Sequence, residues 1–423
     1  MSVSREARES DSPTRQQHSA APASRARFPR LWATAAVVAS ALGVFIVLLA
    51  AGNFFPASSN IFTLAGTYVW ASAAPHLVLV SVVAVLLTVP LWRTKRRRVL
   101  RAIASGVALL ALVSSTVITG SLANAATDNG GSVDFVQAIT LSTPTATATE
   151  ITSYVTVEGE SLEARVYEPE GGAEGAPLMM YIHGGGWQMG SAEESEPTAQ
   201  HWAAQGWYVV SVNYRLSSSQ QPTWDKAPAD LACALTWTDH HAAEAGADTE
   251  RLTVMGDSAG GHLAMLLGWS AADGNAASTC ADQGEVPVPD AIVASYPAID
   301  VQYNYDHGVA PVPGIDPQEF THLFLGGTPT EFPDRMRAIS PLTYLGDDSP
   351  STLVMQPDRD DFIPAEGNYR SVETAARAGV DATIVPVPFA WHAFDAPQGG
   401  LGGQVKNSVT RTWLEERDLA PTR

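Results

Sequence analysis

Two long stretches in the first third of the sequence lack charge, and the whole chain has little cysteine. No Asp, Glu, Lys or Arg occurs in residues 31–92, and a second uncharged stretch covers residues 102–127. Apolar stretches of this length exclude a chain that is soluble throughout, because one helical span of a bilayer needs only about 20 apolar residues. The only cysteines are Cys233 and Cys280, so at most one disulfide can form within the chain.

The uncharged stretches contain three candidate membrane spans, at residues 31–51, near 71–92 and at 102–126. Pro75 and Pro90 are compatible with the second span, because proline is tolerated in the first helical turn and Pro90 disturbs only the last one. A cleaved signal peptide is the alternative for the first span. Its apolar part, however, exceeds the roughly 7 to 15 residues of such peptides, and two more spans follow. Residues 31–126 are therefore predicted to form a membrane region.

Basic residues flank these spans unevenly, because they precede the first span and separate the second from the third, whereas the loop between the first two has none. They are Arg5, Arg8, Arg15, Arg25, Arg27, Arg30, Arg93, Lys95, Arg96, Arg97, Arg98 and Arg101. Loops rich in Lys and Arg stay in the cytoplasm. The pattern predicts a multi-pass protein of the cytoplasmic (plasma) membrane, with a cytoplasmic N-terminus and an extracytoplasmic domain after the third span.

Charge separates the membrane region from the remainder. Residues 1–126 contain 12 basic and 3 acidic residues, a net charge of +9, which leaves −28 on the rest of a chain whose total is −19. So acidic a domain is a poor candidate for binding nucleic acid or anionic lipid. Residues 1–30 are rich in Ser, Arg and Ala and are predicted to be a disordered arm. Residues 127–150, which include STPTATATE, are predicted to be a polar linker.

From residue 151 to residue 423, short β-rich segments alternate with longer helical patterns. This order predicts one α/β domain with a mainly parallel, eight-stranded sheet covered by helices on both faces. The predicted strands are TSYVTV, LEARVYEP, PLMMYIH, WYVVSVNYRL, RLTVMGDSAGG, AIVASYP, STLVMQP and ATIVPVPF. In open sheets of this kind, the functional residues lie at the carboxyl ends of the strands.

The stretch GDSAG fits the pattern G-x-S-x-G, follows the strand LTVM and precedes a helical pattern. This context is typical of a nucleophile elbow, in which Gly256 and Gly260 allow a turn sharp enough to present Ser258 at the edge of the sheet. The alternative is an ordinary tight turn. The sequence predicts that Ser258 is a catalytic nucleophile.

A serine hydroxyl needs a base to remove its proton. Four histidines follow the elbow: His262, His307, His322 and His392. His262 is one helical turn beyond the serine and is expected to pack there, and the next two fall in the irregular region between the sixth and seventh strands. His392 follows the last strand at its carboxyl end, so it is the predicted base, with a surface or core histidine as the alternative.

The base in turn needs a carboxylate to orient it. After the seventh strand, the stretch STLVMQPDRDDFIP offers Asp358, Asp360 and Asp361. A carboxylate in a loop is by default simply solvated, but spacing from the end of the sheet favours Asp360 as the acid, with Asp361 as the second choice.

Three consecutive glycines in MMYIHGGGWQMGS leave the backbone after the third predicted strand without side chains. Attack on a carbonyl creates an oxyanion that backbone N–H groups stabilise, and an HGGG loop supplies such donors. Gly184, Gly185 and Ala259 are the predicted donors, and Gly186 belongs to the same loop. His183 is expected to hold the loop by hydrogen bonding. Next to these motifs, Trp187 and Trp391 are candidates for lining an acyl or aryl pocket, with plain packing as the alternative.

Four motifs, HGGGW, GDSAGGHLA, DDFIP and WHAF, occur in this order, with NYRL and SPLTYL between them. They resemble those of α/β-hydrolase esterases of the hormone-sensitive-lipase-like and feruloyl-esterase-like groups, which also include arylformamidases. The resemblance extends from about residue 151 to the C-terminus. It implies an α/β-hydrolase fold and a Ser-Asp-His carboxylester hydrolase that forms an acyl-enzyme without a metal or organic cofactor. It assigns the acid to Asp360, four residues before Pro364.

Two features depart from the pattern of these groups, since Pro357 stands where Gly is usual and the three spans have no counterpart. The predicted function is a membrane-anchored esterase for small or medium acyl esters. An amidase, an arylformamidase or a peptidase with the same triad is the alternative among enzymes, and a catalytically inactive binding module is the alternative outside them. An extracytoplasmic domain permits a disulfide between Cys233 and Cys280, with two buried thiols as the alternative.

Overall fold

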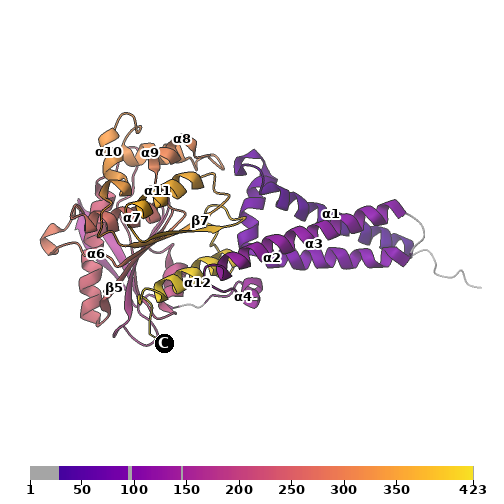
Figure 1. Ribbon diagram of the computed structural model, residues 1–423, viewed down its shortest axis with the longest axis horizontal. Helices are drawn as coiled ribbons and strands as arrows, with labels where there is room; N and C mark the ends of the chain where they lie inside the picture. The colour runs from indigo at the N-terminus through magenta and orange to yellow at the C-terminus, as the bar shows by residue number, and fades with distance from the viewer. Residues whose placement is uncertain (1–27, 94–97, 144–145, 423) are drawn as a thin grey trace, which may run out of the picture.

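The computed structural model describes residues 28–93, 98–143 and 146–422. Most of the predicted disordered arm and Lys95, Arg96 and Arg97 of the basic loop lie outside these ranges. The described residues form a bundle of three long helices that projects from one side of an α/β domain (Figure 1). The bundle helices are α1 (Phe28–Gly52), α2 (Ile61–Thr88) and α3 (Arg98–Thr127), with the short 3₁₀ segments η1 (Ala57–Ser59) and η2 (Val89–Arg93) at the two ends of α2.

All three bundle helices are long and apolar enough to cross a membrane. Small residues let their backbones approach closely, as is usual where helices associate in lipid. A Cβ atom on Gly66 would lie 2.4 Å from the carbonyl oxygen of Leu49, and one on Gly43 would lie 2.9 Å from Val107 Cγ1. Polar contacts add to this packing, since the indole N–H of Trp70 donates to the same Leu49 oxygen at 3.2 Å.

The second helix differs from the predicted second span. It begins at Ile61, about ten residues before the predicted start, and contains a kink with non-helical backbone angles at Ala73 (φ −129°, ψ 16°). The kink divides this helix, and Pro75 lies in the first turn after the kink, as expected, although the helix itself starts earlier than predicted. The physical reason is that proline lacks an N–H and its ring clashes with the preceding turn, so a long helix bends at this point and continues.

The α/β domain contains one eight-stranded sheet with the order β1-β2-β4-β3-β5-β6-β7-β8. The strands are β1 (Glu150–Val157), β2 (Glu160–Tyr167), β3 (Pro177–Ile182), β4 (Tyr208–Val212), β5 (Asp248–Asp257), β6 (Ala291–Ser295), β7 (Ser351–Pro357) and β8 (Ala382–Val387). Only β2 pairs antiparallel with its neighbours, whereas all pairs from β4 to β8 are parallel. The predicted mainly parallel sheet of eight strands is confirmed.

Helices cover both faces of the sheet because alternate residues of a strand point to opposite sides. Leu178 and Met180 of β3 share a core with α6, α7 and α11, whereas Met179 shares a core with α5 and α12. These helices are α5 (Glu196–Ala203), α6 (Lys226–Ala245), α7 (Ala259–Ala272), α11 (Ala365–Arg377) and α12 (Leu401–Glu415). The segment between β6 and β7 adds α8 (Val301–His307), α9 (Pro317–Leu325), α10 (Pro333–Ile339) and η4 (Pro341–Tyr344).

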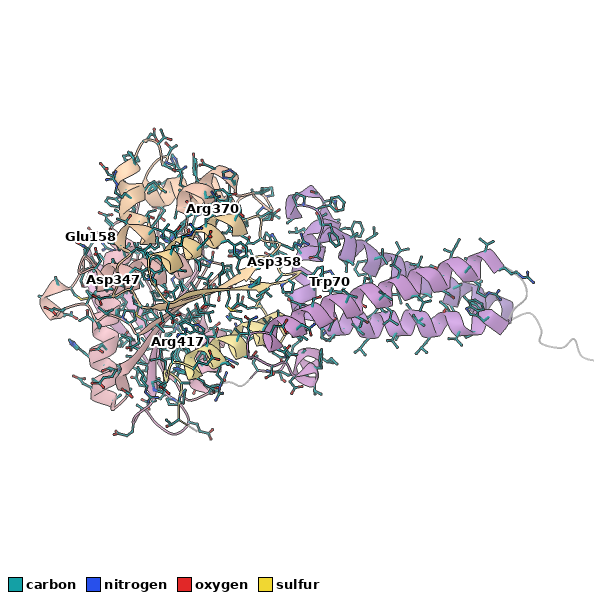
Figure 2. All side chains as sticks on the ribbon, viewed as in Figure 1. Trp70, Glu158, Asp347, Asp358, Arg370 and Arg417 are labelled. Carbon is teal, nitrogen blue, oxygen red and sulfur yellow. A yellow bond between two sulfur atoms is a disulfide. The ribbon has the colours of Figure 1, made fainter. Side chains whose placement is uncertain are left out.

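The bundle is docked on the domain through a shared core. Trp70 of α2 and Leu122 of α3 are buried together with Val405 of α12, and Figure 2 shows Trp70 at this junction, with Asp358 at the adjacent end of the domain. The β7 arrow in Figure 1 points toward the bundle. The carboxyl ends of the parallel strands therefore face the bundle.

The predicted linker, residues 127–150, contains a short helix, α4 (Phe135–Thr140). Asp134 caps it, because its Oδ1 accepts hydrogen bonds from the N–H groups of Val136 (2.7 Å) and Gln137 (3.2 Å). The N–H of Asp134 donates to Gln404 Oε1 of α12. This segment therefore packs against the domain, although its polar composition alone predicted a plain linker.

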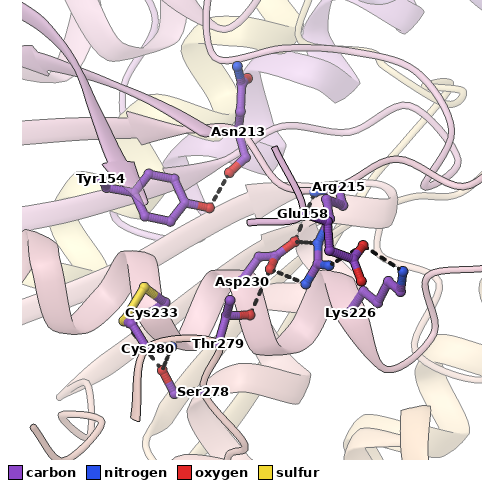
Figure 3. Close-up of polar contacts among 10 residues, drawn as sticks. All are labelled: Tyr154, Glu158, Asn213, Arg215, Lys226, Asp230, Cys233, Ser278, Thr279 and Cys280. Carbon is purple, nitrogen blue, oxygen red and sulfur yellow. Dashed lines mark hydrogen bonds and ion pairs between the residues drawn. A yellow bond between two sulfur atoms is a disulfide. The ribbon is translucent and has the colours of Figure 1, made fainter. Parts of the chain in front are cut away.

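Cys233 of α6 and Cys280, which precedes η3 (Ala281–Gln283), form a disulfide. Beside it, the buried carboxylate of Asp230 accepts hydrogen bonds from the Arg215 guanidinium at 2.6 and 2.7 Å and from Thr279 Oγ1 at 2.7 Å (Figure 3). The ion pair satisfies the carboxylate, because a buried charge without partners is costly. The disulfide and the hydrogen bond from Thr279 together fix α6 to the segment before η3, and the ion pair fixes α6 to the residues after β4.

The double substitution Cys233→Ala and Cys280→Ala is expected to lower the free energy of unfolding by about 4 kcal/mol, because the bridge closes a loop across a sequence separation of 47. The midpoint of thermal unfolding of the full chain in detergent measures this effect. Wild-type protein treated with a reductant is the control and should unfold at the same lowered midpoint. An unchanged midpoint in the double variant would contradict the expectation.

Candidate active site

Ser258 lies on the sharp turn between β5 and α7, with backbone angles φ 54° and ψ −121°. The flanking glycines make this turn possible. A Cβ atom on Gly256 would lie 2.4 Å from the carbonyl oxygen of Gly260, and one on Gly260 would lie 2.2 Å from the carbonyl oxygen of Ile182. The N–H of Ser258 donates to the carbonyl of Ser295 at the end of β6, at 2.9 Å. The turn therefore presents the serine hydroxyl above the carboxyl ends of the central strands.

His392 and Asp360 come together with this serine. The Ser258 hydroxyl lies 3.0 Å from His392 Nε2, and Asp360 Oδ2 lies 2.8 Å from His392 Nδ1. The geometry suits Nδ1–H donating to the carboxylate, which leaves Nε2 free to accept the serine proton. The other oxygen of Asp360 accepts the N–H groups of Phe362 (3.1 Å) and Ile363 (2.8 Å). Burial raises the pKa of Asp360, while His392 and the N–H of Ile363 act in the opposite direction.

The neighbouring carboxylates of this loop point elsewhere. Asp358 is exposed and accepts a hydrogen bond from the hydroxyl of Tyr369 at 3.1 Å. Asp361 accepts the indole N–H of Trp391 at 2.6 Å on one oxygen and the N–H of Ala57 at 2.9 Å on the other. The carboxylate next to Asp360 therefore connects the loop to the bundle and not to His392.

The other candidate histidines lie away from Ser258 Oγ. His262 is fully buried in α7, where its Nε2 lies 2.8 Å from the carbonyl oxygen of Ile339 and its Nδ1 accepts the indole N–H of Trp187 at 3.2 Å. Burial lowers the pKa of His262 to about 4, so the ring is neutral near pH 7. His307 stacks on Tyr303 at the end of α8, and His322 belongs to α9.

The glycine loop lies beside the nucleophile because β3 and β5 are paired in register, with Ile182 opposite Gly256. A Cβ atom on Gly184 would lie 2.8 Å from Asp257 Oδ2 and 3.3 Å from Ser258 Cβ. Gly185 has a φ of +117°, and its Cβ would lie 2.0 Å from the carbonyl oxygen of Met189. These positions therefore exclude any side chain.

Two further residues complete the loop. Gly186 has a φ of +59°, and a Cβ there would lie 2.2 Å from the ring of Phe320. His183 Nδ1–H donates to the carbonyl of Gly184 at 2.7 Å, and its ring stacks on Tyr214 with centroids 4.4 Å apart. Burial lowers the pKa of His183 to about 4, and the hydrogen bond to Gly184 opposes this shift. In the structure, His183 is thus hydrogen bonded to the glycine loop.

Opposite the glycine loop, Ala259 is the first residue of α7. Its N–H has no partner within the helix, as for the first residues of any α-helix. The N-terminus of α7 also contributes a partial positive charge close to Ser258. Ala259 and the glycine loop therefore frame the space in front of the serine hydroxyl.

A cavity of about 600 Å³ opens onto Ser258 and His392. Its apolar lining includes Leu141, Met189, Phe320 and Phe362.

Neither tryptophan proposed from the sequence lines this cavity, which corrects that expectation. Trp187 is buried and stacks on Phe324 with ring centroids 4.6 Å apart, and Trp391 is buried with its indole on Asp361. Proximity in sequence to a motif did not reveal the direction of these side chains.

A polar network in the wall of the cavity was missed by sequence reasoning. The hydroxyl of Tyr181 donates to Asp257 at 2.6 Å, the hydroxyl of Tyr296 donates to Asp395 at 2.6 Å, and Lys406 of α12 forms an ion pair with Asp395. Burial, and then the charge of Asp395, raise the pKa of Asp257. Burial opposes ionisation of Asp395 as well, but Lys406 outweighs it and lowers the pKa of Asp395.

The position of these residues gives a partial signal, because Asp257 precedes the nucleophile and Asp395 lies three residues after His392. No motif, however, relates either of them to Lys406. Among the residues that the structure describes, no group of three or more His, Cys, Asp or Glu side chains is arranged to hold a metal ion.

Comparison with known proteins agrees with this fold. Residues 165–372 match the family model BD-FAE. Esterase LipQ of Mycobacterium tuberculosis is 28% identical over 228 residues, which cover 52% of this chain and 51% of that protein. The hormone-sensitive lipase of Bos taurus is 33% identical over 155 residues, which cover 35% of this chain and 19% of that protein. The chain therefore spans about half the length of LipQ and about a fifth of the length of the lipase.

Solved structures of an esterase are similar in fold. Thermogutta terrifontis esterase 2, phosphoramylated by tabun, superposes with a TM-score of 0.54 at 23% identity, covering 67% of this chain and 98% of that one. Its butyrate-bound form gives a TM-score of 0.53 at 25% identity, covering 66% of this chain and 97% of that one.

The sheet order and these matches show an α/β-hydrolase fold, and the similar proteins are named esterases and a lipase. Within that fold, residues 165–372 are similar to the BD-FAE family. The fold that the resemblance of HGGGW, GDSAGG, DDFIP and WHAF implied is therefore confirmed, and the similar proteins bear the names of esterases and a lipase.

Proposed function

We propose that this chain is a membrane-anchored carboxylester hydrolase that uses Ser258, His392 and Asp360 through an acyl-enzyme intermediate. The observation that supports it most directly is the continuous set of contacts from the serine hydroxyl to His392 (3.0 Å) and from His392 to Asp360 (2.8 Å). A buried carboxylate, an imidazole and a serine in this order form a nucleophile that is activated by an oriented base.

The reaction follows from this arrangement. His392 Nε2 accepts the proton of Ser258 as its oxygen attacks the ester carbonyl, and the N–H groups of Gly184, Gly185 and Ala259 stabilise the oxyanion. His392 then protonates the leaving alkoxide, and a water molecule activated by the same imidazole hydrolyses the acyl-enzyme. Asp360 stabilises the imidazolium in both steps. The proposal requires no metal and no organic cofactor.

The alternatives share most of this chemistry. An amidase, an arylformamidase or a peptidase needs the same triad, and a catalytically inactive binding module needs none of it. The combination of triad contacts and side-chain-free glycine loop favours an active enzyme. The hydrolysis of a series of p-nitrophenyl acyl esters and of the matching anilides, with the full chain in detergent, separates these possibilities.

Ser258→Ala is expected to abolish ester hydrolysis and to leave the thermal unfolding midpoint close to that of wild type, because a single hydroxyl on a turn contributes little to stability. His392→Ala should be similarly inactive, since an unassisted hydroxyl is a poor nucleophile at neutral pH. Turnover of p-nitrophenyl butyrate measures both effects. His322→Ala is the matched control and should keep near wild-type turnover. Wild-type rates in a folded Ser258→Ala protein would remove the serine mechanism.

Asp360→Asn is expected to lower the turnover number by up to about 10⁴-fold, because an amide at this position favours the wrong tautomer of the base. Asp358→Asn should be nearly silent, since Asp358 is exposed and its carboxylate accepts a hydrogen bond from the Tyr369 hydroxyl and not from His392. Asp361→Asn should have a much milder effect than Asp360→Asn. The same p-nitrophenyl ester assay tests all three. A severe loss in Asp361→Asn beside a mild one in Asp360→Asn would move the acid by one position.

We further propose that the three bundle helices span the cytoplasmic membrane, with the N-terminus in the cytoplasm and the hydrolase domain outside. The length and composition of the helices support the crossing. The basic residues before the first span and between the second and third spans support the orientation, because positively charged loops stay inside.

Protease added to intact cells is expected to digest the hydrolase domain, because this topology exposes it on the outer side. A tag placed after Arg423 measures the outcome, and a cytoplasmic marker protein is the control for intact membranes. A tag that becomes accessible only after the cytoplasmic membrane is permeabilised would reverse the topology.

A further inference from the structure

The catalytic loops rest directly on the membrane-side helices. The loop after β7 contacts the end of the α1–α2 turn, where Asp361 accepts the N–H of Ala57 at 2.9 Å. The loop after β8 contacts α2 twice. The ring of Trp391 lies 4.7 Å from that of Tyr68, and the Ser72 hydroxyl donates to the carbonyl of Ala396 at 2.7 Å. Because Asp361 and Trp391 adjoin two residues of the triad, the triad lies next to the end of the bundle.

The apolar surface of the bundle ends close to these contacts. Among the described residues of α3, exposed large apolar side chains occur from Val99 to Val117. That length is about the 20 residues that cross a hydrocarbon core. The hydroxyls of Ser81 and Ser115 lie 3.2 Å apart and align α2 with α3. His76, which is nearer to the domain along α2, therefore lies just beyond the level at which the exposed apolar stretch of α3 ends.

Helix α4 lies at this boundary, because His76 Nε2 is 2.9 Å from the carbonyl oxygen of Ile139. Four apolar side chains that belong to α4 or directly follow it are exposed. They are Phe135, Val136, Ile139 and Leu141, and Val136 has 70% of its surface exposed. A short helix with unburied apolar side chains at the end of a membrane span is typical of a segment that lies in the bilayer interface.

A second apolar rim occurs on the turn between α1 and α2. Phe54, Phe55, Ile61 and Phe62 are exposed there. The guanidinium of Arg359, from the loop after β7, lies 5.4 Å from the ring centroid of Phe54. Exposed apolar residues therefore lie next to both catalytic loops, on α4 and on the turn between α1 and α2.

The catalytic cavity reaches α4. Leu141 and Thr143, which follow α4, line the same cavity as Ser258 and His392. Ala396 and Gln398 line it as well, and Ala396 is the residue that α2 contacts through Ser72. The cavity thus runs from the nucleophile to a rim at the level of the membrane boundary.

We infer that the substrates are amphiphilic esters resident in the bilayer, whose acyl chains enter the catalytic cavity from the interface beside α4 and Leu141. This inference rests on the proposed esterase function and names its substrate class. The apolar lining at Met189, Phe320 and Phe362 suits a hydrocarbon chain. The net charge of −28 outside the membrane region disfavours anionic head groups, so uncharged or zwitterionic esters are expected.

The full chain in phosphatidylcholine vesicles provides the test, with two probes. 4-Methylumbelliferyl oleate partitions into the bilayer, and p-nitrophenyl acetate is supplied from water. The variant Phe135→Asp/Val136→Asp places two charges on α4. It is expected to lower the hydrolysis of the oleate by about tenfold or more, because charged side chains resist transfer out of water, and to leave acetate hydrolysis within about twofold of wild type.

Val288→Asp is the matched control, because Val288 is exposed and precedes β6 at the opposite end of the strands. It should leave the hydrolysis of both esters unchanged. Equal losses of oleate and acetate hydrolysis in the α4 variant, or no loss of either, would overturn the inference. A wild-type protein that hydrolyses the acetate but not the oleate would also overturn it. Hydrolysis of neither ester by wild type would instead reject the proposed function.

Discussion

The turn at Ser258 is the constraint on which the site depends. A non-glycine residue with a φ of 54° is strained by about 1 to 3 kcal/mol, and such strain persists only where the surroundings enforce it. Here the backbone hydrogen bond from Ser258 to Ser295 and the close approach of Gly260 to Ile182 enforce it. The turn follows β5, which lies between β3 and β6 in the sheet. The glycine loop after β3 therefore lies beside the serine hydroxyl.

A second constraint connects the catalytic loops to the bundle. Asp361 is hydrogen bonded to Ala57 and Trp391, so its two oxygens join the turn before α2 to the loops that contain Asp360 and His392. The core of α12 continues into α2 and α3 through residues such as Trp70 and Leu122. Removal of the bundle would expose this apolar surface and leave the Asp361 carboxylate without one of its donors. The bundle is therefore a structural part of the site as well as a candidate anchor.

Much of the fold was predictable because its signals are local. The eight strands follow from short β-rich segments, and the elbow at Ser258 follows from small residues between a strand and a helix. His392 and Asp360 could be predicted to lie near Ser258 because the carboxyl ends of parallel strands lie at the same end of the sheet. The direction of Trp391 and the pair of Asp395 with Lys406 were not predictable. Each depends on contacts between segments that are distant in the sequence, and no local pattern specifies them.

The position of the bundle at the carboxyl ends of the strands has a physical consequence. A domain attached through a flexible linker alone would rotate freely relative to the membrane. In this chain, the residues after α3 are fixed to the domain, since Gly131 lies against Ser408 and Val409 of α12, and Asp134 is bonded to Gln404. The orientation of the sheet relative to α3 is therefore set by packing. If α3 spans the bilayer, the carboxyl ends of the parallel strands, where Ser258 lies, face the lipid surface. The amino ends of these strands then face water.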